Sequence, residues 1–152
     1  MRLRTAGVAL FVLAIAAPSG AVGTWYDYYL DARDKHLAAQ QWDAALASLK
    51  QAVKLKPDSG ADERTYGMDF IDYFPYYYQG VAYHRTQQWD SAILMFNIEE
   101  KAGAIKRRPL YRELLRLRRE AEAARGEADR TVRIKKLKDE VDRLRRESAD
   151  LH

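Results

Sequence analysis

The chain of 152 residues contains no cysteine. This absence excludes disulfide bonds, thiol nucleophiles, zinc–thiolate sites and lipoprotein acylation. It leaves the compartment open, because an exported protein does not need disulfides. Only four prolines and eight glycines interrupt the sequence, so long helices are compatible with most of it.

Residue patterns that mark catalytic or metal sites are also missing. The three histidines, His36, His84 and His152, do not form a pair four residues apart on one helix, and neither a glycine-rich phosphate loop nor a nucleophile elbow occurs. The acidic pair Glu99 and Glu100 is interpreted as capping or solvated rather than as an acid–base couple. We therefore expect a protein that is not an enzyme and that holds neither a metal nor a cofactor.

The longest apolar run is too short to be a typical membrane span. It covers residues 6–17, follows Arg2 and Arg4, and ends at Pro18, whereas a bilayer-spanning helix needs about 20 residues. A positive start, a short apolar stretch and small residues are typical of a secretory signal. We predict a signal peptide at 1–23, cleaved after Ala21 or Gly23, and an exported, periplasmic protein without a stable membrane span. The alternative is an uncleaved anchor in the inner membrane.

Charge is distributed unevenly along the chain. The net charge is +2 over residues 1–23, −5 over 24–100 and +7 over 101–152. An acidic body followed by a basic tail is consistent with a partner specific to the tail or with head-to-tail association. Solvated helix faces rich in lysine and arginine explain the same pattern equally well.

One sequence segment occurs twice. Residues 40–49 read QQWDAALASL and residues 87–96 read QQWDSAILMF. Each copy begins with Gln-Gln-Trp-Asp and continues with apolar residues at helical spacing, which indicates a helix that buries one face.

These segments resemble the tetratricopeptide repeat. The second copy has small, aromatic and apolar residues at the family spacing; the first fits from its tryptophan onward, but its small residue Ala32 lies one position early and Arg33 occupies the crossing position. The positions that the resemblance assigns to repeat packing are Trp42, Ala45, Leu49, Pro57, Gly80, Tyr83, Trp89, Ala92 and Phe96. Residues 65–92 also resemble exported or envelope members of this family in bacteria.

The resemblance implies a repeat domain at 24–104. Its first repeat would cover about 26–59 and its second about 73–104, with a linker at 58–72 that either packs back on the repeats or lines a groove. Asp72 is a candidate N-cap for the helix that contains Pro75 in its first turn.

The resemblance also implies a concave face that binds a peptide or a partner helix. The residues expected on it are Tyr29, Arg33 and Leu37 from the first repeat and Phe74, Tyr77, Val81, His84 and Arg85 from the second. Aromatic rings and guanidinium groups suit such ligands through stacking and charge-assisted hydrogen bonds.

The tail is predicted to be helical throughout. Leu110, Leu114 and Leu117 begin an apolar seam over 105–126, which we interpret as a capping helix for the second repeat. Residues 127–152 are interpreted as a basic amphipathic helix with coiled-coil character, continuous with the first part or hinged near Gly126. Its seam is Ile134, Leu137, Val141 and Leu144.

That seam leaves three possibilities open: a homodimer, a solitary projecting helix, or a different protein partner. Nucleic acid is not expected, because the basic residues of the tail alternate with acidic ones and the N-terminus indicates export. The predicted fold class is all-α: two repeat-like helical hairpins, a capping helix and a long charged C-terminal helix. The function expected from it is a non-catalytic protein-interaction module or scaffold; the alternative is a structural homo-oligomer in which the repeats are a spacer.

Overall fold

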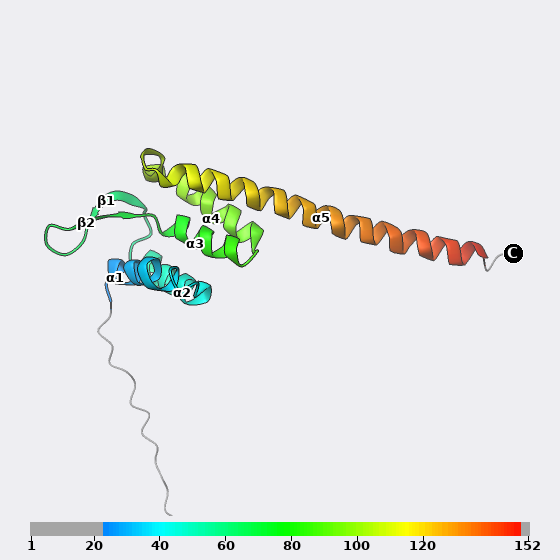
Figure 1. Cartoon of the computed structure of the whole chain (residues 1–152), viewed down its shortest axis with the longest axis horizontal. Helices are drawn as coiled ribbons and strands as arrows, with labels where there is room; N and C mark the ends of the chain where they lie inside the picture. The colour runs from blue at the N-terminus through cyan, green and yellow to red at the C-terminus, as the bar shows by residue number, and fades with distance from the viewer. Residues whose placement is uncertain (1–22, 150–152) are drawn as a thin grey trace, which may run out of the picture.

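The structure, a computed structural model, describes residues 23–149 (Figure 1). Its elements in chain order are α1 (Trp25–Leu30), the π-helical segment η1 (Asp31–His36), α2 (Trp42–Leu55), β1 (Gly60–Arg64), β2 (Phe70–Tyr73), α3 (Pro75–Arg85), α4 (Trp89–Ala102), the 3₁₀ turn η2 (Ala104–Arg107) and α5 (Leu110–Ala149). The described chain is mainly helical, as predicted. An all-α class is broadly consistent with this architecture, and the exception within the described residues is a small two-stranded antiparallel sheet, β1 with β2.

Both helical hairpins turn in the same way. Gln40 and Gln87, the first glutamines of the two Gln-Gln-Trp-Asp copies, adopt φ of 57° and 59°. The next backbone N–H in each copy reaches back to close the preceding helix, from Gln41 to the carbonyl of His36 and from Gln88 to that of Tyr83. The second helix of each hairpin then begins at the tryptophan and is 14 residues long. The repeated sequence therefore forms a repeated local structure.

In the second hairpin the helices cross at Gly80. A Cβ built on this residue would lie 2.5 Å from Cε1 of Phe96, well inside van der Waals contact. Ala92 and Phe96 are fully buried in the same cluster, and Tyr83 and Trp89 pack at its edge. The residues predicted for repeat packing in this hairpin thus lie within or beside one buried cluster.

In the first hairpin Ala32 takes the crossing position. It is fully buried against Leu49 and Ala52. Ala32 lies eight residues before Gln40, whereas Gly80 lies only seven before Gln87. The extra residue is accommodated by the wider turn of η1, since a π-helical turn holds one more residue than an α-helical turn. The irregular spacing noted in the sequence is thus absorbed locally, and close packing is kept.

The segment between the hairpins is a β-hairpin rather than a structureless linker. Arg64 pairs with Phe70 and Glu63 with Ile71, and the register shifts between Glu63 and Gly60. Asp72 belongs to β2, so the prediction that it caps α3 is wrong. Phe74 occupies the N-cap position and makes no side-chain cap bond, while Pro75 lies in the first turn as expected.

The long helix α5 covers the second hairpin and then leaves it. Leu114, Leu117 and Ala121 are buried against α3 and α4. The helix continues without a hinge through Gly126 to Ala149. Figure 1 shows its second half projecting away from the body.

The predicted signal peptide lies outside the described residues, except for Gly23. Within residues 23–149, no helix has the length and apolar character required to cross a membrane.

Candidate interaction surfaces

Three residues expected on a concave binding face are core residues instead. Tyr29 and Phe74 are 1% and 0% exposed, and Tyr77 is 5% exposed. Tyr29 donates a hydrogen bond to the carbonyl of Asp72 (2.8 Å) and accepts one from the backbone of Phe74 (3.2 Å), which ties α1 to the entry of α3. Its burial raises the pKa of the hydroxyl far above the usual value. The prediction that these three rings line an open groove is therefore wrong.

The second-repeat part of the expected groove is occupied by the chain's own helix α5. Tyr77 shares its cluster with Leu114 and Leu117 of that helix. His84 packs edge-on against Trp89 (5.4 Å between ring centroids), and its Nε2 lies 3.5 Å from Glu120 of α5. Burial lowers the pKa of His84, although Glu120 opposes the shift. Because α5 lies beside α3, His84 is an interface residue and not part of an open surface.

Several residues of the predicted face remain at least partly accessible. Arg33 stacks over the Tyr29 ring at 5.6 Å and pairs with Asp34 at 2.6 Å, which leaves its side chain 30% exposed. Val81 is half-buried and Arg85 is exposed. We call Arg33, Val81 and Arg85 the inner strip. Leu37, also expected here, is half-buried.

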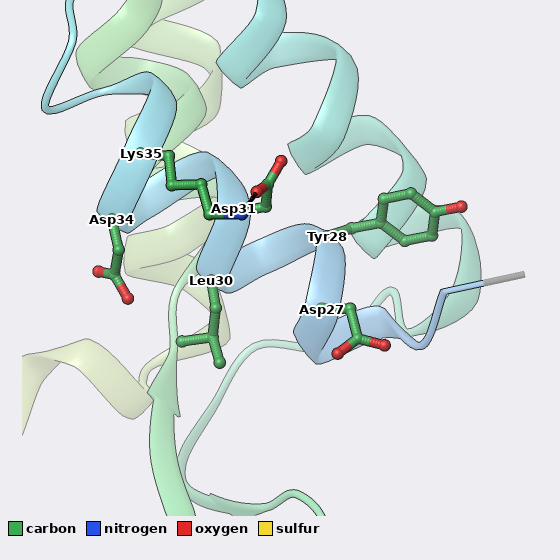
Figure 2. A pocket seen from close by; sticks show the side chains of 6 residues that line it. All are labelled: Asp27, Tyr28, Leu30, Asp31, Asp34 and Lys35. Carbon is green, nitrogen blue, oxygen red and sulfur yellow. Dashed lines mark ion pairs between the residues drawn. The ribbon is translucent and has the colours of Figure 1, made fainter. Parts of the chain in front are cut away.

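A shallow pocket of about 450 Å³ lies on the outer face of α1 and η1 (Figure 2). Three aspartates line it together with Tyr28, Leu30 and Lys35. Each carboxylate already has partners within the chain. Asp27 accepts from Thr24, Asp31 pairs with Lys35 and His36, and Asp34 pairs with Arg33. These internal partners already engage the carboxylates. Within residues 23–149 no group of histidine and acidic side chains is arranged to hold a metal.

The only buried acid among the described residues is Glu99 of α4. Its Oε2 accepts hydrogen bonds from the backbone N–H groups of Tyr76 and Tyr77, both at 3.1 Å, and so caps α3 from a neighbouring helix. Desolvation raises the pKa of Glu99 to about 7, although these two amides and the Ser59 hydroxyl lower it. Glu99 was expected to be solvated or a local cap, and the structure makes it a buried cap for another helix.

The adjacent Glu100 behaves in the opposite way. It accepts a hydrogen bond from Tyr111 (2.6 Å) and pairs with Arg118 on α5. These contacts lower the pKa of Glu100. The two neighbouring carboxylates thus anchor different elements, one the start of α3 and the other the first half of α5.

The tip of the β-hairpin is apolar and exposed. Tyr66 and Met68 are 84% and 81% exposed, and Phe70 is half-exposed. The base of the hairpin is fixed, because Arg108 contacts Asp62 at 2.7 Å and Asp72 at 3.0 Å. This segment was expected either to pack back on the helical hairpins or to line a groove. Only its base contacts the rest of the chain, and its tip extends away from the helical hairpins (Figure 1).

The projecting half of α5 carries the seam predicted from the sequence. Ile134, Leu137, Val141 and Leu144 are between 45% and 59% exposed, and Lys138 and Arg145 flank a shallow pocket along them. The basic excess of the tail lies before this half. Residues 101–126 hold nine basic and three acidic side chains, whereas 127–152 hold eight and seven. The description of 127–152 as basic is therefore wrong; this half is nearly neutral.

No protein-family model matches the chain, and comparisons with curated proteins and with solved structures found no match.

Proposed function

We propose that this chain is a non-catalytic protein-interaction module or scaffold with tetratricopeptide-like repeats that works outside the cytoplasm. The observation that carries the proposal is the stacking of helical hairpins: α1 with α2, α3 with α4, and the first half of α5 laid over the second pair. Each pair buries its apolar face against the next. Proteins built in this way present extended surfaces that bind other proteins.

The inner strip is the surface that we assign to partner binding. Its two guanidinium groups, on Arg33 and Arg85, lie on the first helices of successive hairpins. Arg33 already donates two hydrogen bonds to Asp34, so the exposed Arg85 is the cation on which the assignment depends. Half-buried Val81 lies on the same helix as Arg85. This composition suits an acidic peptide or the polar face of a partner helix, because guanidinium groups pair with carboxylates through two parallel hydrogen bonds. The strip consists of three residues, so the expected affinity is modest.

Capture of partners from an envelope fraction of the host tests this assignment. The full chain is compared with Arg85→Glu, which reverses charge on the inner strip, and with Lys54→Glu, which makes the same change at an exposed position near the end of α2. We expect Arg85→Glu to lose a partner that the other two proteins retain. Equal capture by all three proteins would contradict binding through the inner strip.

The location is tested separately. The proposal of export depends on the sequence of residues 1–23, and mass determination of the protein purified from its host measures the N-terminus directly. A mass that matches a chain beginning at Val22 or Thr24 supports export. The mass of the uncleaved chain, measured in a cytoplasmic fraction, contradicts it.

A further inference from the structure

The second half of α5 presents an apolar seam that nothing in the described chain covers. Every residue from Glu127 to Ala149 is exposed. The seam consists of Ile134, Leu137, Val141 and Leu144, spaced by steps of three, four and three residues. This is the spacing at which two helices pack side chains into each other's gaps.

The seam faces away from the body of the protein. Leu117, which is buried against the second hairpin, and Leu144 of the seam are 27 residues apart within one continuous helix. At 3.6 residues per turn this separation is about 7.5 turns, so the two side chains point to opposite sides of α5. A second helix can therefore lie along the seam without meeting α3 or α4.

We propose that the seam binds a second copy of the same chain as a parallel, in-register, two-stranded coiled coil. This proposal uses a surface different from the inner strip and goes beyond the function proposed above. The residue types at the seam carry the argument. Ile134 and Val141 occupy the a positions of a heptad and Leu137 and Leu144 the d positions. Residues branched at Cβ, such as isoleucine and valine, pack best at the a positions of a parallel two-stranded coiled coil, and leucine packs best at the d positions.

The flanking charges of a parallel pair make one attractive and one repulsive kind of contact. In a parallel pair Glu140 of one helix, at position g, lies opposite Arg145 of the other, at the following e position, and the contact occurs twice by symmetry. Arg133 meets Lys138 of the other copy, which opposes association and makes the dimer weak. The parallel orientation is thus decided mainly by the shape of the core.

An antiparallel pair is less favourable at its centre. If Ile134 is placed opposite Leu144 of the second copy, Lys138 faces Lys138 and Glu140 faces Glu140 near the symmetry axis. The attractive contacts, between Arg133 of one helix and Glu147 of the other, lie at the two ends of the pair. The antiparallel arrangement also places β-branched residues opposite leucines in each layer, which loses the match that the parallel pair provides.

Sedimentation of the full chain over a wide concentration range tests association. We expect the mass to rise from monomer towards dimer, and a double variant, Leu137→Ser with Leu144→Ser, to remain monomeric. Arg146→Glu changes an outward position and should dimerise like the parent. Unchanged tryptophan fluorescence shows that the body is folded in each protein, because all three tryptophans precede residue 90. A monomer at every concentration, or a trimer, overturns the proposal.

A charge exchange tests the parallel orientation. Arg145→Glu should weaken the dimer by about three- to tenfold, since two attractive contacts become repulsive, and adding Glu140→Arg should restore it. In the antiparallel pair described above, Arg145 faces Thr131 and the second change gives no restoration. Failure of the double variant to recover therefore overturns the parallel arrangement. Loss of partner capture by Arg85→Glu has no bearing on either result.

Discussion

Replacing Glu99 by glutamine should make the protein more stable at high pH and remove part of its pH dependence. The carboxylate is fully buried, and its pKa is about 7 in the folded protein compared with 4.5 as the ordinary value. The folded state therefore binds a proton more tightly than the unfolded chain. As pH rises from 4.5 to 7, the unfolded chain loses this proton first, and stability falls.

The expected size follows from the difference in pKa. About 2.5 pKa units at 1.36 kcal/mol each give a loss of about 3 kcal/mol between pH 4.5 and pH 8. Glutamine keeps the shape and the acceptor oxygen that caps the backbone of Tyr76 and Tyr77, but it carries no charge. Glu99→Gln should thus match the parent near pH 5 and exceed its stability by about 2–3 kcal/mol at pH 8.

Urea unfolding followed by tryptophan fluorescence at pH 5, 6, 7 and 8 measures this difference. The other titrating groups are common to both proteins, so their contribution cancels in the comparison. Glu100→Gln is the matched control, because the hydrogen bonds from Tyr111 and Arg118 lower the pKa of Glu100. Replacing the Glu100 carboxylate should lower the free energy of unfolding more at neutral pH than in acid. A difference between Glu99→Gln and the parent that stays constant from pH 5 to 8 would refute the reasoning.

Two further substitutions test the packing of the hairpins. Gly80→Ala should lower the free energy of unfolding by about 1–3 kcal/mol, because the new methyl group meets the Phe96 ring; Gly126→Ala, where only the flexible end of a side chain lies near, should raise it by up to about 1 kcal/mol. Equal effects of the two changes in urea unfolding would contradict the close crossing. Tyr29→Phe should cost about 1–3 kcal/mol, since it leaves the buried backbone N–H of Phe74 without its acceptor; thermal unfolding should show no change for Tyr66→Phe at the exposed hairpin tip.

The helical hairpins could be predicted because their determinants are local. Trp89, Ala92 and Phe96 are on one face of a helix by spacing alone, and Gly80 leaves the space that the Phe96 ring occupies. The extra residue of the first repeat was also visible in the sequence. Its consequence, the π-helical turn at Ala32, was not, because a helix can absorb one residue in several ways and the choice depends on the neighbour it packs against.

The β-hairpin could not be predicted from its own residues. Residues 58–65 are mostly polar, and a two-stranded sheet is only marginally stable by itself. It is held by contacts with distant parts of the chain, through Arg108 to Asp62 and Asp72 and through the hydroxyl of Tyr29. The glycine at position 67, with φ of 70°, was the one local sign of a tight turn.

The expected groove failed for a reason that the sequence already contained. A helix that caps the second repeat through Leu114 and Leu117 must lie beside α3, and it then covers the side chains that α3 would otherwise present. The capping helix and the open second-repeat groove were incompatible predictions. The first half of α5 lies on the second hairpin because its apolar side chains are buried against α3 and α4, whereas the groove had only the family resemblance to support it.

The burial of Glu99 also had a sequence signal. Ala92, Phe96 and Glu99 follow one another by four and three residues, so the glutamate falls on the apolar face of α4 and not on its solvated side. Glu100 is rotated by about 100° around the helix axis, which directs it to Arg118. The helical periodicity that places Ala92 and Phe96 on the buried face of α4 thus directs Glu99 and Glu100 to different sides of the helix. One is forced into the core with a raised pKa, and the other is held at an ion pair with a lowered one.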